Sequence, residues 1–165
     1  MAFTAVMFGL ISALTWGAGD FSGGMAVKRS NPYGVVLIAH VMSLFMMLAL
    51  ALIFKENIPP WTDWLWGGVA GICGGVGLVL LYHSLATGQM SVAAPVSALV
   101  AAALPVFVSM FSEGLPRIFT LLGFALALMA VWLISGGFEI ELRFGNLFLP
   151  VVAGLAFGGF FTAIA

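Results

Sequence analysis

Charged residues are scarce in this sequence: Asp, Glu, Lys and Arg make up only 7% of its 165 residues. A water-soluble domain carries about a quarter charged residues, which keep its surface hydrated. So few charges cannot cover a globule of this size, which excludes an ordinary soluble domain. Because 63% of the residues are hydrophobic, the composition predicts a protein that is surrounded mostly by lipid.

The near-neutral charge and the single cysteine exclude further classes. A net charge of −1 provides neither a basic surface for nucleic acid nor an acidic tail for a soluble partner. Cys73, the one cysteine, lies in an apolar run and cannot form an intrachain disulfide. No basic segment precedes the first apolar run, so we expect that run to stay as a membrane helix and not to be a cleaved signal peptide.

The sequence also lacks the motifs of catalysis, metal binding and nucleotide binding. It has no His-Glu-x-x-His, no Gly-x-Ser-x-Gly and no pair of acids within one predicted helix. His40 and His83 lie in different apolar runs, with no carboxylate at ligand spacing. The glycine-rich run 74–77 lacks the lysine of a phosphate loop. We therefore predict no enzymatic activity, no bound metal and no cofactor.

Long apolar runs, separated by short connections, fill the rest of the chain. A bilayer core about 30 Å thick needs roughly 20 helical residues. The connections contain proline, glycine and most of the charges, which end helices and mark the membrane surface. The fold class is therefore all-α, a polytopic membrane helix bundle. The predicted transmembrane helices are residues 4–24, 33–54, 64–86, 92–111, 118–136 and a sixth from about residue 145. The loop charges are too evenly spread to decide the orientation.

Asp20 is the ionisable residue that stands out in the first predicted helix. It follows Trp16 by four residues, so the two share a helix face. An acid inside a membrane helix is costly and is a functional candidate for that reason. The alternative is that Asp20 lies near the interface and either extends towards water or pairs with Lys28 or Arg29.

Two further polar candidates lie in the second and third predicted helices. His40 could bind a proton or a substrate group, or could make a single hydrogen bond between helices. Tyr82 lies near the end of its helix, where it would line a cavity mouth or anchor in the interface.

The fourth predicted helix carries Pro95 and Ser97 as cavity candidates. Pro95 removes a backbone donor and can expose a carbonyl group, as in the broken helices of transporters. A kink that only helps packing is the alternative. Together these candidates predict a polar cavity surrounded by the first four helices, with the fifth helix at the periphery.

Small residues at four-residue spacing predict close contacts between helix backbones. The residues that we assign to such packing are Gly67, Gly71, Gly75 and Ala98.

Four segments of the chain together resemble one known family. They are Leu14-Thr15-Trp16-Gly17, then Tyr82 to Gln89 followed by Ser91 to Pro95, then Leu104-Pro105 with Glu113 beyond, and Leu121-Leu122-Gly123. In this order and at these spacings they are similar to the EamA-type family of the drug/metabolite transporter superfamily. The chain has Ser112-Glu113-Gly114 where that family often has Gly-Glu-Arg. Asp20 is not usual in the family, and a subgroup with its own substrate would explain it.

The resemblance implies two tandem five-helix repeats of opposite orientation. Residues 1–137 would form the first repeat, and residues 138–165 would form a loop and the first helix of the second. Phe157-Gly158 matches Trp16-Gly17 when the two helices are aligned, which agrees with a repeat. We therefore expect either that the rest of the second repeat is missing or that two copies assemble as an antiparallel homodimer. In a single chain, Gly154, Gly158 and Gly159 would then face lipid.

The sequence thus predicts a permease that moves a small organic metabolite or drug-like solute by alternating access, driven by a gradient. We expect it in the cell membrane as a multi-pass protein whose partners are the lipid bilayer and the solute, and not nucleic acid. One alternative is a small multi-spanning structural or assembly protein with tight interfaces and no polar cavity. A second is an intramembrane enzyme, which would present paired polar residues at midplane depth.

Overall fold

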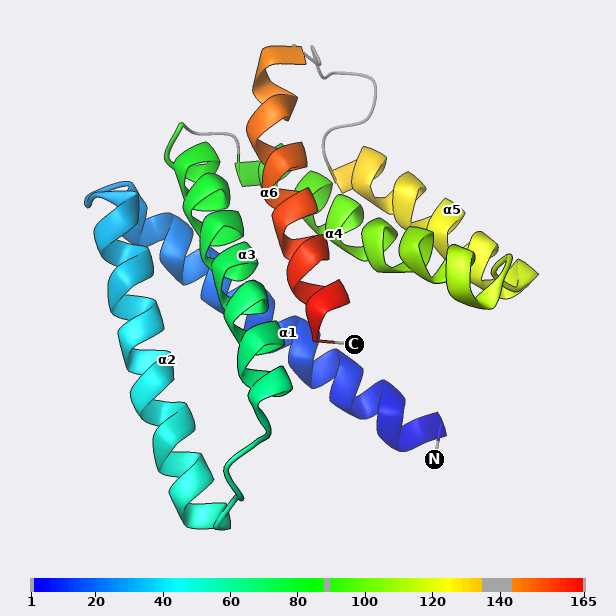
Figure 1. Cartoon of the computed structure of the whole chain (residues 1–165). Helices are drawn as coiled ribbons and strands as arrows, with labels where there is room; N and C mark the ends of the chain where they lie inside the picture. Colours follow the sequence, from blue (N-terminus) through cyan, green and yellow to red (C-terminus); the bar gives the residue numbers. More distant parts are fainter. Residues whose placement is uncertain (1, 88–89, 135–143, 165) are drawn as a thin grey trace.

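The computed structural model of the protein describes residues 2–87, 90–134 and 144–164. Over these ranges it consists of six helices without a strand, which confirms the all-α prediction. The helices are α1 (Ala2–Val27), α2 (Pro32–Phe54), α3 (Trp61–Ala86), α4 (Met90–Glu113), α5 (Ile118–Ile134) and α6 (Phe144–Ala163), shown in Figure 1.

Local sequence explains where α2 begins and ends. The side chain of Asn31 accepts a hydrogen bond from the backbone N–H of Tyr33 at 2.9 Å, and Pro32 occupies the first turn, where its missing N–H costs nothing. At the other end, Lys55 adopts the left-handed conformation with φ 55° and donates its N–H back to the last turn. The observed helix therefore matches the predicted range 33–54 within one residue.

Length and composition allow three of the helices to cross a membrane: Pro32–Phe54, Trp61–Ala86 and the Val92–Phe111 part of α4. Two shorter apolar helices, Ile118–Val131 and Leu147–Ala163, accompany them. Large apolar side chains on the outside are highly exposed; Leu52 and Phe119 are each 80% exposed. Such a surface suits lipid as the solvent, and the fold is that of a helical membrane bundle.

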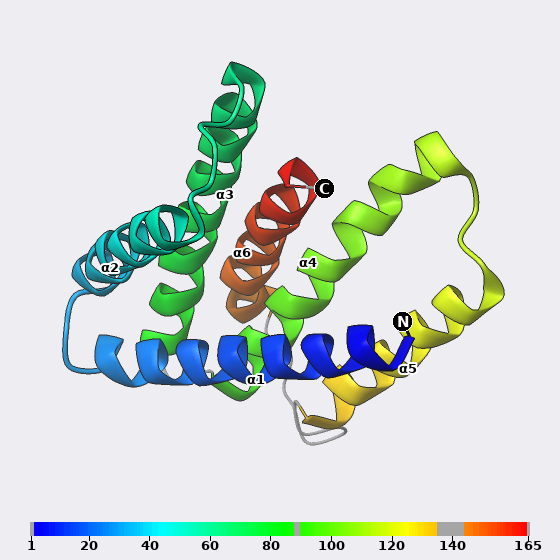
Figure 2. The same ribbon diagram turned by 90° about the horizontal axis from the view of Figure 1, so that it is seen from below.

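Helix α6 lies at the centre of the arrangement, between α3 and α4 (Figure 1). Its contacts with these two helices are the most extensive in the described chain. Helix α2 packs beside α3, and α5 packs on α4. Helix α1 contacts α3 and α2 and runs across the other helices at a steep angle (Figure 2). Helix α6 therefore connects the α2–α3 side of the bundle to the α4–α5 side.

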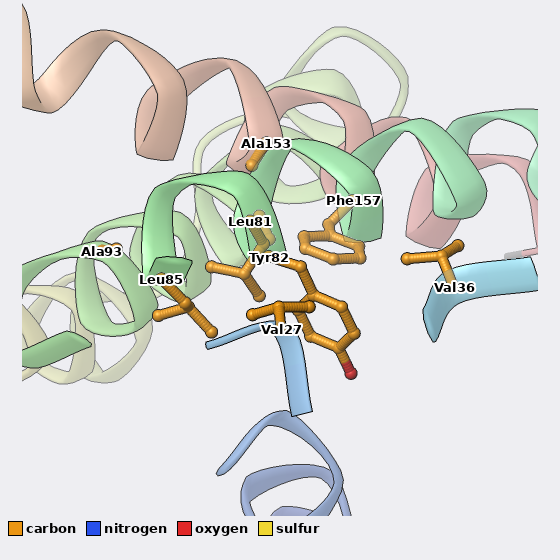
Figure 3. Close-up of a cluster of buried hydrophobic side chains, with 9 residues drawn as sticks. Val27, Val36, Leu81, Tyr82, Leu85, Ala93, Ala153 and Phe157 are labelled. Atoms are coloured by element: carbon orange, nitrogen blue, oxygen red, sulfur yellow. The ribbon is translucent and has the colours of Figure 1, made fainter. Parts of the chain in front are cut away.

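The buried core lies where α3, α4 and α6 meet the ends of α1 and α2 (Figure 3). Leu81 and Leu85 of α3 are the largest of its fully buried side chains. The other members are Val27, Val36, Tyr82, Ala93, Ala101, Ala153 and Phe157. Because the residues from α4 and α6 are mostly alanines, these helices approach closely.

The prediction that the glycines of α6 face lipid is wrong. A Cβ atom added to Gly154 would lie 2.6 Å from the carbonyl oxygen of Ser97. One added to Gly158 would lie 2.6 Å from Cβ of Leu104, and at Gly159 it would lie 3.4 Å from Sγ of Cys73. The helices that pack against these glycines are α4 and α3 of the same chain and not helices of a second repeat.

The glycine stripe predicted in α3 differs from the observed contacts. No neighbouring atom comes within 4 Å of a Cβ placed on Gly67 or Gly71 in the described part of the chain, and at Gly75 the nearest is Nε2 of His40 at 3.7 Å. The close approaches are on an adjacent face, where a Cβ on Gly74 would lie 3.3 Å from the ring of Phe160 and one on Gly77 would lie 2.9 Å from the ring of Phe157. Aromatic rings of α6 therefore rest on these two glycines.

Candidate functional site

Asp20 lies two-thirds of the way along α1, half-buried, at the wall of two cavities. The smaller has a volume of about 260 Å³ and lies between α1, α3, α4 and α6. The larger has a volume of about 550 Å³ and lies between α1, α4 and α5. Both are lined mainly by apolar side chains, so the carboxyl group is their distinguishing chemical feature. We call them the smaller and larger Asp20 cavities.

Trp16 lies one turn before Asp20 and lines the same two cavities, as their four-residue spacing predicts. Its ring centroid is 6.2 Å from that of Phe161 in α6, and the ring planes are tilted by 51°. Phe157, one turn earlier in α6, also lines the smaller cavity. Three aromatic residues therefore line the smaller cavity together with Asp20.

Helix α4 supplies the wall that both cavities share, through Ala94, Ala98 and Ala102 at four-residue spacing. Ser97 is buried in the smaller cavity, and its hydroxyl donates to the carbonyl oxygen of Ala94 at 3.0 Å. Pro95 lines the larger cavity. The structure therefore brings Pro95 and Ser97 to Asp20. It places Ala98 on the cavity wall, although the sequence assigned that residue to helix packing.

Helix α5 packs on α4 at the edge of the bundle, as predicted, but it also forms a wall of the larger cavity, which the sequence did not predict. Its residues Phe124, Ala127, Ala130 and Val131 line that cavity opposite α1. The prediction depended on the absence of ionisable residues from this helix. An apolar helix can still form one side of a cavity whose polar group comes from another helix.

His40 belongs to a different cavity, of about 400 Å³, between α1, α2, α3 and α6. Its Nδ1 atom lies 3.0 Å from the carbonyl oxygen of Val36, one turn earlier, so this nitrogen carries the proton in that hydrogen bond. Trp16 and Phe157 line both the His40 cavity and the smaller Asp20 cavity. They form an aromatic partition between His40 and Asp20, which the sequence had assigned to a single cavity.

Tyr82 is buried in the core and lines none of these three cavities. Its hydroxyl end packs against Gly23, which leaves no room there for a side chain, and so holds α1 against α3 (Figure 3). Gly23 follows Asp20 by less than one turn of α1. Tyr82 therefore fixes the position of the helix that carries Asp20.

The alternative in which Asp20 pairs with Lys28 or Arg29 is not observed. Both basic residues follow the end of α1 and are exposed. Eight helical residues separate Asp20 from Lys28, a rise of about 12 Å. Among the residues that line either Asp20 cavity there is no lysine, arginine or histidine. Over the described ranges, no three His, Cys, Asp or Glu side chains gather at a possible metal site.

Sequence reasoning did not select Phe157 and Phe161 as site residues. A signal for the first was present, because the repeat alignment matches Phe157-Gly158 with Trp16-Gly17. In the structure, Trp16 and Phe157 line the same two cavities.

A comparison with protein families identifies the family of the chain. A profile of the EamA-like transporter family matches residues 3–136, which is most of the chain and includes α1 to α5. Neither the curated proteins nor the solved structures that were compared include a match.

Proposed function

This chain belongs to the EamA-like transporter family, and on that premise we propose that it moves a small organic solute across a membrane through the two Asp20 cavities. The family makes the protein a membrane transporter of the drug/metabolite transporter type, one that lies in a lipid bilayer. The solute, the alternating-access mechanism and the cell membrane as its location belong to the proposal.

The observation that carries the proposal is the placement of Asp20. It lies on α1, on the wall of a cavity of about 550 Å³, without an ion-pair partner in the described chain. Ligand cavities for small molecules are typically about 300–1,000 Å³ and mostly apolar, with a few polar groups that fix the ligand's orientation. An intramembrane acid at such a cavity is typical of solute and ion pathways. A structural or assembly protein would need the close helix contacts but not this cavity.

The arrangement of helices supports an organisation in repeats. We assign α1 to α5, within residues 1–137, to one repeat and α6, within residues 138–165, to the start of a second. The family profile ends at residue 136, in agreement with that boundary. Transporters built from inverted repeats bind their solute where the repeats meet. In this chain Trp16 of α1 and Phe161 of α6 meet beside Asp20. A solute or ion gradient would drive the movement.

Transport by cells that carry the full-length gene tests the proposal. A panel of labelled metabolites and drug-like solutes should include at least one whose flux is saturable and exceeds that of cells with an empty vector. If the protein is inserted in the membrane but carries no member of a broad panel, the transport proposal is contradicted.

Filling the Asp20 cavities should block this flux. Ala102 lines both cavities, so Ala102→Phe places a ring where the solute would lie. We expect the flux to fall by at least about tenfold, which corresponds to about 1.4 kcal/mol of lost solute affinity. The matched control is Ala49→Phe, because Ala49 is an exposed residue of α2 that lines neither cavity. Equal flux in both variants would show that the solute takes another route.

A further inference from the structure

We infer that the Asp20 cavities bind an organic monocation with a flat aromatic body; this inference names the solute class and rests on the proposed function. Four features of the two cavities lead to it. They are the unpaired acid, the aromatic rings around it, the smooth wall of small residues opposite, and the lack of any group that would suit an anion.

The carboxyl group of Asp20 needs a positive partner if it is ionised. No ion pair involves it in the described chain, and it is the one charged residue among those that line the two cavities. A carboxylate away from water is destabilised by several kcal/mol unless it is paired and hydrogen-bonded. Since the protein places no cation there, a bound cation would supply the missing charge.

The rings of Trp16 and Phe161 complete a site for a cation. A positive charge within about 6 Å of an aromatic centroid is attracted by the face of the ring, and tryptophan is the strongest such partner. The two centroids are 6.2 Å apart and their planes are tilted by 51°, so they form an open angle and do not stack on each other. Asp20 is one turn from Trp16, so a cation held by the carboxylate in the smaller cavity would share that cavity with both rings.

The shape of the cavities favours a flat body behind the charge. Ala94, Ala98 and Ala102 form a smooth stripe along α4 that lines both cavities. The larger cavity continues between this stripe and the small residues Ala127 and Ala130 of α5. An aromatic ring can lie between two such stripes with its faces against methyl groups. Its charged end would then reach Asp20 at the common edge of the two cavities.

The same walls disfavour anions and zwitterions. Neither cavity is lined by a lysine, arginine or histidine in the described chain. The hydroxyl hydrogen of Ser97 is already donated to the carbonyl oxygen of Ala94. A carboxylate or phosphate group in these cavities would therefore find no hydrogen-bond donor among these side chains. It would also be repelled by an ionised Asp20.

Asp63 is the competing candidate, because it lines a cavity of about 520 Å³ together with Trp66. Its surroundings differ from those of Asp20. Asp63 is exposed in the first turn of α3 and accepts a hydrogen bond from the hydroxyl of Thr62 at 3.2 Å. Near a helix N-terminus and in contact with water, this carboxylate is stable without a ligand. We therefore place the cation at Asp20.

Binding of tritiated N-methyl-4-phenylpyridinium to the purified chain in lipid nanodiscs tests the inference. We expect saturable binding that biphenyl-4-carboxylate, an anion of the same shape, does not displace. Asp20→Asn keeps the shape and removes the charge, and should weaken binding at least tenfold, or about 1.4 kcal/mol. Asp20→Glu should stay within about threefold of the wild type, because it retains the charge. The matched control is Glu56→Gln, which removes an exposed acid from the loop between α2 and α3.

Wild-type affinity in Asp20→Asn, displacement by the anion, or a loss that appears in Asp63→Asn instead would each overturn the inference. If Asp20→Asn does not fold, Trp16→Leu decides the question. It should weaken binding of the cation by about tenfold and that of neutral 4-methylbiphenyl much less, because only the cation loses a cation–π contact. Equal losses for both would contradict a cation site. Flux of neutral solutes without cation binding would overturn this inference and leave the transport proposal standing. Cation binding without flux of any solute would support this inference and contradict the transport proposal.

Discussion

Gly158→Leu should separate α6 from α4 and destabilise the whole bundle. Even a single added Cβ at Gly158 would lie 2.6 Å from Cβ of Leu104 and 3.3 Å from the carbonyl oxygen of Ala101. That oxygen has no helical donor four residues later, because Pro105 has no N–H. Gly158 of α6 lies beside this oxygen, and a larger residue there would collide with Leu104 and crowd the oxygen. We expect a loss of about 3 kcal/mol or more in the free energy of unfolding, at the upper end of what overpacking costs.

The measurement is the midpoint of detergent-induced unfolding of the purified protein in mixed micelles. Gly67→Leu is the matched control, because it makes the same change in another apolar helix at a glycine with open space around it. This control should unfold at or above the wild-type midpoint, since leucine favours a helix more than glycine does. If both variants unfold alike, the close packing of α6 against α4 is not a source of stability.

Phe157→Ala should have the second large effect. It should lower the stability of the protein and open the aromatic partition between the smaller Asp20 cavity and the His40 cavity. The ring of Phe157 is 7% exposed and rests on Gly77 of α3. Removing a buried phenylalanine side chain typically costs about 3–5 kcal/mol, and glycine cannot fill the space that is left. The smaller Asp20 cavity and the His40 cavity, of about 260 and 400 Å³, would then join.

Phe148→Ala is the control for this prediction, because Phe148 lies in the same helix and is 68% exposed. It should leave the unfolding midpoint near that of the wild type, whereas Phe157→Ala lowers it. Phe157→Leu should recover about half of the loss, since it restores part of the buried side chain. A midpoint in Phe157→Ala no lower than in Phe148→Ala would remove Phe157 from the core.

The sequence predicts well where the helices of this protein lie along the chain. It predicts poorly which helices pack against each other. A run such as 33–54 is apolar along its length, and lipid requires such a run to be helical, because every backbone N–H and C=O must find a partner within the segment. The helical state of α2 follows from that requirement, and its ends at Pro32 and Phe54 follow from the local signals of Asn31, Pro32 and Lys55. Which helix packs beside which depends on contacts that leave little trace in composition. A membrane helix that is apolar all round does not show which face is buried.

The candidate site shows the same division. The spacing of Trp16 and Asp20 was enough to place both on one helix face, and both line the same two cavities. The four-residue spacing of Gly67, Gly71 and Gly75 was equally regular, yet the close contacts occur at Gly74 and Gly77. Periodicity identifies a stripe on a helix but not whether another helix lies opposite. The sequence does not predict that α5 lines the larger cavity for a similar reason, since small apolar residues can line a cavity or face lipid equally well.

The way α6 is held in the bundle has a mechanical consequence for the protein. Helices α3, α4 and α6 interlock through glycines and aromatic rings and should move as one stiff body. Helix α1, which carries Asp20, crosses this body and contacts only α3 and α2 extensively. We therefore expect a path to the carboxyl group to open and close by rotation of α1 about the contact between Tyr82 and Gly23, with the ring contact of Trp16 and Phe161 changing as it does so. Asp20 would then move with α1, whereas the alanine stripe that faces it would stay in place with α4.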